Sequence, residues 1–302
     1  MASTDSLNWS QAALNYNSTS FGSLPEYRSW MVSLILEGFE IPDEYTKPNL
    51  LIADLGGGTG LFTQSLAEAC HVEFLNVDAC PEMLAQSAKP GLVRTLCMDA
   101  VEFAHSQTSN LPFRHFLIKD ALHLIPWEQH TYLFEGLLSK LDPSGSIIIL
   151  TRPNKSPFPF FALAHKQWSE CHPPYEVYID ALRAAGFSVL VRISTFPMTL
   201  PKQQWFQLLA SRFFSPLKKL TDLELETGLC ELQTLYANDD SIAFEDCAIV
   251  LQAKRSRGIS KVVDAEALCI KDVIQRKCPS FRLFSVMKLV AVPKRGTTVE
   301  PP

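Results

Sequence analysis

The chain has 302 residues, of which 47% are hydrophobic and 20% are charged, and its formal net charge is −5. These values are typical of a globular protein that buries one large core. The acidic balance gives no electrostatic reason to expect a nucleic-acid partner. No apolar run reaches the roughly 20 residues of a transmembrane helix, and no signal peptide is evident. We therefore expect a cytoplasmic protein with no membrane partner.

Acidic and basic residues are unevenly distributed along the chain. Residues 254–302 hold 11 Lys and Arg against 4 Asp and Glu, so the remaining residues are strongly acidic. We expect this segment to be a basic C-terminal extension that is partly disordered. The eight cysteines include no C-x-x-C pair, so the sequence predicts no metal site.

Helix and strand patterns alternate through the first two thirds of the chain. Apolar residues recur at helical spacing over residues 26–40, and we expect residues 1–45 to form an N-terminal helical lid segment. Strands are predicted over residues 50–54, 72–77, 93–98, 116–118 and 146–150, and helices over residues 60–70, 81–88, 127–141 and 175–185. Strands that alternate with crossover helices indicate an α/β fold with a parallel sheet covered on both faces.

The pattern changes after residue 186. Residues 187–196 and 242–253 are predicted as two further strands, which would complete a mostly parallel, seven-stranded sheet. Between them lie two helical patterns, and Thr221 followed three residues later by Glu224 is a capping-box signature for the second. We expect residues 198–241 to form a helical cap inserted into one domain over residues 46–253.

The segment ADLGGGTGLF, residues 53–62, places four glycines in five residues after an apolar strand. A dinucleotide-binding turn needs G-x-G-x-x-G, but counting from Gly56 the third glycine is replaced by Leu61. A P-loop needs Lys-Ser or Lys-Thr after the glycines, and neither is present. Asp54, two residues before the first glycine, disfavours a phosphate and favours a cationic ligand group. This spacing argues against a nicotinamide oxidoreductase.

The pattern D-x-G-x-G-x-G resembles motif I of the class I S-adenosylmethionine (SAM) methyltransferases, and the resemblance extends over about residues 16–253. It implies a Rossmann-like, doubly wound fold with SAM as the cofactor. An Asp at a strand end is also a common helix cap, which is the alternative reading of such residues. The residues that would hold the cofactor are Asp54, Gly56, Gly58 and Gly60 in the turn, Asp78 at the ribose, and Asp99 with Ala100 at the adenine, beside Met83 and Met98.

The N-terminal segment and the fourth strand offer further cofactor contacts. In relatives that act on small molecules, a Tyr and an Arg of the N-terminal segment fold over the methionine part of SAM, and Tyr16 and Arg28 match these roles. Lys119, at the end of the fourth strand, would border the cofactor. The alternatives are a solvated helix residue for Arg28 and a solvated lysine for Lys119.

The acceptor is expected beyond the carboxyl ends of the fourth and fifth strands. His123 is the candidate general base, because an imidazole titrates near neutral pH, and packing beside the cofactor is the alternative. Arg152 would pair with an acceptor carboxylate, unless it forms a surface ion pair. The aromatic residues that would wall the pocket, or alternatively fill the core, are Trp168, Phe158, Phe160 and Phe161.

These features together predict a SAM-dependent methyltransferase that methylates an O or N atom of a small-molecule metabolite. The helical cap favours a compact acceptor. The alternative is a SAM-binding scaffold or regulatory protein without turnover. His165 and His172 lie seven residues apart and, without a third ligand, are interpreted as ordinary residues. The sequence leaves the oligomeric state open.

Overall fold

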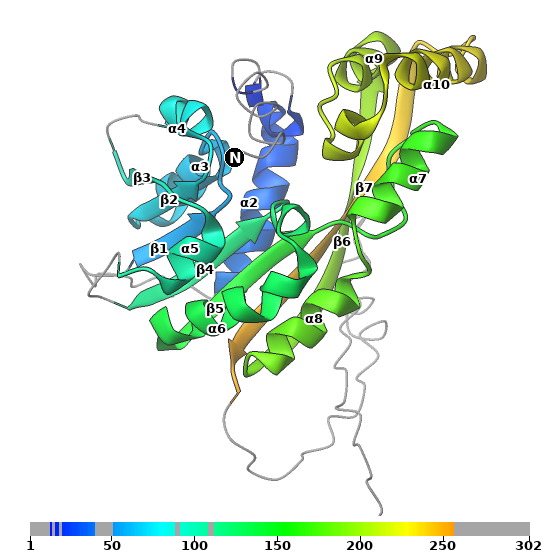
Figure 1. Cartoon of the computed structure of the whole chain (residues 1–302). Coiled ribbons are helices and arrows are strands. Elements are labelled where there is room, and N and C mark those ends of the chain that lie inside the picture. The colour runs from blue at the N-terminus through cyan, green and yellow to red at the C-terminus, as the bar shows by residue number, and fades with distance from the viewer. Residues whose placement is uncertain are drawn as a thin grey trace, which may run out of the picture.

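Among the residues described in the computed structural model of the chain, seven strands form a single sheet (Figure 1). The structure describes residues 13, 16, 17, 20–39, 51–87, 91–107 and 112–256, so nearly all of the predicted C-terminal extension lies outside the described residues. β7 runs in the opposite direction to the other six strands of this sheet, which confirms the predicted Rossmann-like, mostly parallel sheet. In spatial order the strands are β3 (Val93–Cys97), β2 (Phe74–Asp78), β1 (Leu51–Leu55), β4 (Phe113–Lys119), β5 (Leu141–Thr151), β7 (Ser241–Arg255) and β6 (Phe187–Pro201).

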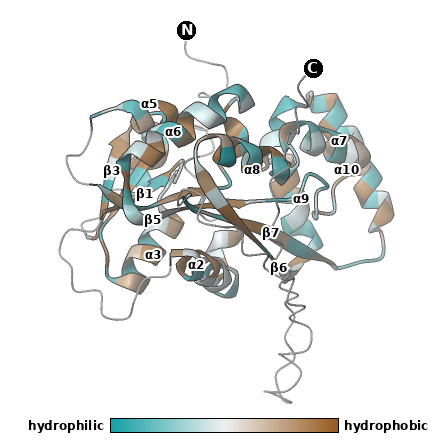
Figure 2. Ribbon diagram, turned by 90° about the horizontal axis from the view of Figure 1, so that it is seen from below, coloured by the Kyte–Doolittle hydropathy of each residue, from teal (hydrophilic) through white to brown (hydrophobic). Residues whose placement is uncertain are grey.

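Helices cover both faces of this sheet (Figure 2). On one face lie α2 (Pro25–Phe39) and α3 (Leu61–Cys70), and on the other α5 (Ala100–His105), α6 (His130–Lys140) and α8 (Tyr175–Ala184). The short α4 (Pro81–Ser87) follows β2. None of the helices in the described residues has the length and apolar character of a membrane span.

The central strands are apolar on both sides because both faces of the sheet are covered. Ile147 and Ile149 of β5 pack in the core beneath α6 and α8, whereas Ile148 and Leu150 pack in the core beneath α2. All four side chains are fully buried. This is the pattern expected for a strand inside a doubly covered sheet, and it explains why the sequence shows a continuous apolar run there.

The two last strands extend well beyond the sheet. β6 and β7 pair continuously from Phe187 with Arg255 to Pro201 with Ser241, whereas β5 pairs with β7 only between residues 249 and 254. The free part of this hairpin reaches α9 (Lys202–Ala210), the short helix η4 (Ser215–Lys219) and α10 (Asp222–Leu235), and α7 (Ala162–Cys171) lies beside the same end of the sheet (Figure 1). The helical part of the predicted cap thus begins at Lys202, after four further residues of strand.

The start of α10 confirms the predicted capping box. The Thr221 hydroxyl accepts a hydrogen bond from the Glu224 backbone N–H, and the Glu224 carboxylate accepts one from the Thr221 backbone N–H. Two other local features differ from prediction. The six-residue α5 was not predicted, and β5 begins at Leu141 because that residue already pairs with Phe113.

Candidate active site

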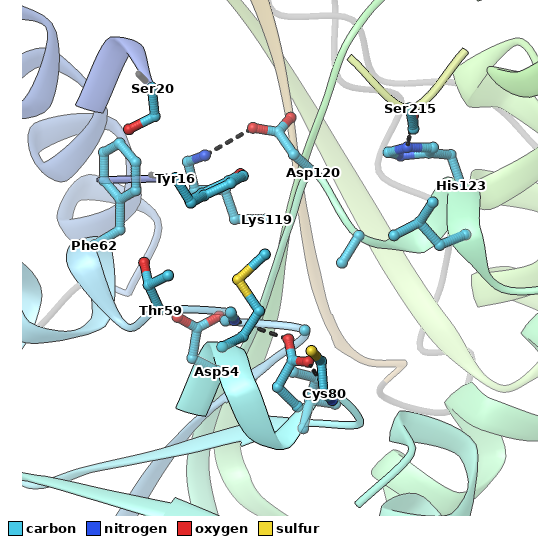
Figure 3. Close-up of a pocket in the computed structure, with 18 of the residues that line it drawn as sticks. Tyr16, Ser20, Asp54, Thr59, Phe62, Cys80, Lys119, Asp120, His123 and Ser215 are labelled. Carbon is cyan, nitrogen blue, oxygen red and sulfur yellow. Dashed lines mark hydrogen bonds and ion pairs between the residues drawn. The ribbon is translucent and has the colours of Figure 1, made fainter. Parts of the chain in front are cut away.

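A cavity of about 410 Å³ lies at the carboxyl ends of β1 and β4, where the strand order changes direction. Open α/β sheets bind ligands at this position, and the volume lies within the range of small-molecule sites. Figure 3 shows Asp54 and Cys80 apart from His123 and Ser215, with Lys119 and Asp120 between them. We call the part of the cavity around Asp54 and Cys80 the cofactor side, and its other lining residues are Gly58, Asp78, Met83, Met98, Asp99 and Ala100. We call the part around His123 and Ser215 the acceptor side, and its other lining residues are Arg152, Phe158, Trp168, His172, Phe213 and Phe214.

The glycine turn is tightly packed from behind and open towards the cavity. Gly56, Gly58 and Gly60 have φ of 73°, 57° and 70°, a region that residues with a Cβ adopt at a cost. A Cβ on Gly60 would overlap the Ser87 hydroxyl, whereas a Cβ on Gly58 would meet no atom within 4 Å. Gly58 therefore leaves space that a ligand can fill, and Gly60 allows the turn to approach Ser87.

Asp54 is buried beneath this turn. Its Oδ2 accepts a hydrogen bond of 2.6 Å from the Thr63 hydroxyl, but its Oδ1 has no hydrogen-bond partner among the described residues. Burial raises the pKa of this carboxyl group to about 6. A buried carboxylate oxygen without a donor is costly, so a cationic ligand group that reached this oxygen would be bound favourably.

The next two strand ends place two more carboxylates on the cofactor side. Asp78 accepts hydrogen bonds of 2.8 Å from the backbone N–H groups of Gly58 and Cys80, one on each oxygen. Each oxygen keeps a second lone pair for a ligand hydroxyl. Asp99 caps α5 through one oxygen, so the helix-cap reading is correct and the residue also lines the cavity. Met83, Met98 and Ala100 line it as well.

The two predicted N-terminal contacts have different positions. Tyr16 lines the cavity, and its ring stacks on Phe213 of the cap at a centroid distance of 5.4 Å. Arg28 is not among the lining residues, and its Nε donates a hydrogen bond of 2.7 Å to the Gly22 carbonyl. Arg28 holds the turn η1 (Phe21–Ser23), of which Phe21 and Gly22 line the cavity. A direct contact of Arg28 with the cofactor stays a prediction.

The segment after β4 carries an acidic residue that sequence reasoning missed. Lys119 lies 2.7 Å from Asp120 Oδ2 and 4.2 Å from the centre of the Phe62 ring, so it borders the cavity as a paired cation. The other Asp120 oxygen lies 3.2 Å from Arg152. Burial opposes ionisation of Asp120, but Arg152 and Lys119 outweigh it and lower its pKa to about 2. Asp120 has a φ of 51°, so the chain turns sharply at this residue, and no sequence pattern predicts that turn.

Arg152 does not have the role predicted for it. Its Nε and Nη2 lie 2.9 Å and 3.1 Å from the two oxygens of Asp246, and Nη2 also donates to the Tyr27 hydroxyl at 2.9 Å. Its Nη1 pairs with Asp120. Because all three guanidinium nitrogens have protein partners, none is left for an acceptor carboxylate. Arg152 thus forms ion pairs, as the alternative has it, but they are buried and not at the surface, since Arg152 is only 6% exposed.

His123 lies on the acceptor side within a stack of three rings. Its ring centroid is 4.1 Å from that of His172, which in turn stacks on Trp168 at 3.9 Å. His123 Nε2 lies 3.1 Å from the hydroxyl of Ser215 in the cap. Burial lowers the pKa of His123 to about 4, although Asp120 opposes the change, so the imidazole is neutral at neutral pH. His172, read from sequence as ordinary, is thus a neighbour of the candidate base.

The predicted aromatic wall is present in part. Trp168 and Phe158 line the cavity, and the Trp168 indole N–H donates to the Pro153 carbonyl at 3.0 Å. Phe160 and Phe161 are buried but do not line it, so they belong to the core. The cap adds Phe213 and Phe214, which sequence reasoning did not single out. Within the described ranges, no group of three or more potential metal ligands is found.

Comparison with known proteins gives a family match for the central part of the chain. Residues 52–145 match the family model of a methyltransferase domain. No curated protein sequence matches the chain significantly. The crystal structure of the YcgJ protein from Bacillus subtilis has a TM-score of 0.52 and 15% sequence identity, covering 76% of this chain and 100% of that one. This likeness establishes the fold.

Two further solved structures have lower scores. The cyclopropane synthase MmaA2 from Mycobacterium tuberculosis has a TM-score of 0.49 and 14% identity, covering 82% of this chain and 94% of that one. Phosphoethanolamine N-methyltransferase 2 from Haemonchus contortus, in complex with phosphomonomethylethanolamine and S-adenosylhomocysteine, has a TM-score of 0.46 and 16% identity over 75% of this chain. The aligned region spans 52% of that protein, about half its length.

Proposed function

We propose that this chain, whose residues 52–145 match a methyltransferase domain, is a class I SAM-dependent enzyme that transfers a methyl group to an O or N atom of a small-molecule metabolite. The observation that supports this most directly is the position of His123. A neutral imidazole lines the same cavity as the glycine turn and the carboxylates predicted to hold SAM. A proton acceptor beside a methyl-donor site suits an acceptor that loses a proton when it is methylated.

The residues of the cofactor side suit the chemical groups of SAM. The unpartnered Asp54 Oδ1 suits the ammonium group, and the remaining lone pairs of Asp78 suit the ribose hydroxyls. Met83 and Met98 offer apolar contact to the adenine. When bound there, SAM supplies an electrophilic methyl group on a sulfonium.

The protein's own contribution is positioning, exclusion of water and acceptance of a proton. Methyl transfer needs the acceptor atom, the methyl carbon and the sulfur in line, so a closed cavity that fixes the acceptor lowers the barrier. η1, η4 and the cap residues Phe213 and Phe214 all line the cavity and restrict its size. His123 takes the acceptor proton, and its neighbours Ser215 and His172 hold the ring in place.

The proposal is tested by incubating the protein with methyl-labelled SAM and a metabolite extract, followed by mass spectrometry. We expect one or a few small metabolites to gain the label. SAM binding without any labelled product would favour the alternative of a scaffold without turnover. Label on protein or nucleic acid, and on no small molecule, would contradict the assignment of the acceptor class.

SAM affinity is expected to fall as the pH is lowered below about 6. The ammonium group binds the ionised form of Asp54, so binding lowers the pKa of this carboxyl group from its value of about 6 in the free protein. Below pH 6 the free protein must lose a proton to bind SAM, and affinity should fall up to about tenfold per pH unit. Calorimetric titration between pH 5 and pH 8 measures this.

The matched control is Asp54→Asn, which has nearly the same shape and no charge. It should bind SAM more weakly at pH 8 and lose the dependence around pH 6. An equal dependence in the variant and the parent protein would show that Asp54 is not the titrating contact.

A further inference from the structure

We infer that the methyl acceptor is an uncharged aromatic hydroxyl compound, a phenol, that binds on the acceptor side beside His123. The inference rests on the proposed function and specifies its substrate class. It is carried by three independent features of the acceptor side, namely its charges, its aromatic lining and its proton acceptor.

The charges disfavour an anionic acceptor. Among the described residues that line the cavity, the only lysine and arginine are Lys119 and Arg152. Lys119 is paired with Asp120, and every guanidinium nitrogen of Arg152 has a partner in Asp120, Asp246 or Tyr27. A carboxylate or phosphate on the acceptor would therefore be buried without a cation, which is strongly unfavourable.

The same network argues against a cationic acceptor. Asp120 is the lining carboxylate nearest to the acceptor side, and both of its oxygens are already held by cations. An aliphatic amine is protonated at neutral pH, as lysine is, and would need a carboxylate of its own. At neutral pH the His123 and His172 side chains are both uncharged, because burial lowers their pKa values. The acceptor side thus favours an uncharged molecule.

The lining of the acceptor side is aromatic. Phe158, Trp168, Phe213 and Phe214 border it, and Phe21 and Tyr27 extend the same wall. Phe21, Phe158 and Phe214 contact one another with centroid distances between 5.1 and 6.1 Å. Flat apolar rings pack well against such a surface, and aromatic pairs are more favourable than their buried area alone predicts.

A hydroxyl on the ring is the group that His123 can activate. The imidazole is neutral but only weakly basic, since its pKa is lowered to about 4. An aromatic hydroxyl ionises near pH 10, as tyrosine does, whereas an aliphatic hydroxyl holds its proton about as tightly as water. In the reaction the phenol oxygen forms a bond to the methyl carbon, and the carbon–sulfur bond breaks with its electron pair left on sulfur. The hydroxyl proton passes to His123.

The test identifies the atom that gains the label in the metabolite experiment. We expect the labelled product to be an aryl methyl ether without a charged group, identified by fragmentation and by the chemical shift of the methyl group. A label on nitrogen, on a carboxylate or on an aliphatic oxygen would overturn this inference and leave the methyltransferase activity standing. SAM binding with no labelled product would instead contradict the proposed function.

A second arm uses the aromatic lining. Phe213→Leu should raise the KM for the labelled acceptor by roughly 2- to 12-fold with little change in kcat, because an aromatic contact is lost and the apolar volume is largely kept. The matched control is Phe206→Leu, which changes a phenylalanine of α9 that does not line the cavity. Equal KM values in the two variants would contradict an aromatic acceptor.

Discussion

The His123→Ala variant is expected to bind SAM with nearly unchanged affinity and to turn over about 10²–10⁴ times more slowly. The predicted cofactor residues Asp54 and Asp78 lie elsewhere in the cavity, so removal of the imidazole should take away the proposed proton acceptor and leave the predicted cofactor contacts. Calorimetry with SAM and single-turnover rates on the same variant separate the two effects. The matched control is His165→Ala, since His165 does not line the cavity.

The pH dependence of the parent protein provides a second check on His123. In the proposed mechanism the neutral imidazole accepts the proton, and its pKa is lowered to about 4. At saturating SAM, turnover should therefore be lost only as the pH falls through about 4, not near the usual 6.5 of histidine.

If His123 merely packs beside the cofactor, the His123→Ala variant should lose SAM affinity and stability, while turnover per bound SAM stays the same.

Gly60→Ala and Gly58→Ala are expected to separate the packing of the glycine turn from its ligand space. Both residues have positive φ, so alanine costs about 1–2 kcal/mol at either position. Only at Gly60 does the new Cβ overlap Ser87, whose hydroxyl accepts a hydrogen bond from Asn76. That overlap should cost a further 1–3 kcal/mol, roughly.

Thermal unfolding and SAM titration distinguish the two variants. Gly60→Ala should lower the melting temperature clearly, whereas Gly58→Ala should remain folded and bind SAM about tenfold or more weakly, because its Cβ occupies open space in the cavity wall. Unchanged SAM affinity in Gly58→Ala would mean that the ligand does not approach this part of the turn.

Local sequence signals predicted the sheet well, and they also singled out three carboxylates that the fold brings to one cavity. A parallel sheet covered on both faces requires continuous apolar strands, and Ile147 to Leu150 show such a run. The residues at the ends of β1, β2 and β3 meet at one edge once the strand order is given. Asp54, Asp78 and Asp99 were therefore predicted to lie together, and all three line the cavity.

Side chains whose partners are distant in sequence could not be predicted. Arg152 is neutralised by Asp246, 94 residues away, so its sequence position at a strand end could not reveal that it is unavailable to an acceptor. His172 and Ser215 reach His123 from α7 and the cap. The extension of β6 and β7 depends on their mutual pairing beyond the sheet, which local propensity does not encode.

We propose that the cavity at the carboxyl ends of β1 and β4 holds SAM. Isothermal titration with SAM, carried out on the parent protein and on the Asp78→Ala variant, is the decisive measurement. We predict saturable binding by the parent protein and clearly weaker binding by the variant, because Asp78 faces the cavity from the end of β2 and its carboxylate also holds Gly58. An absence of binding by the folded parent protein would contradict the claim.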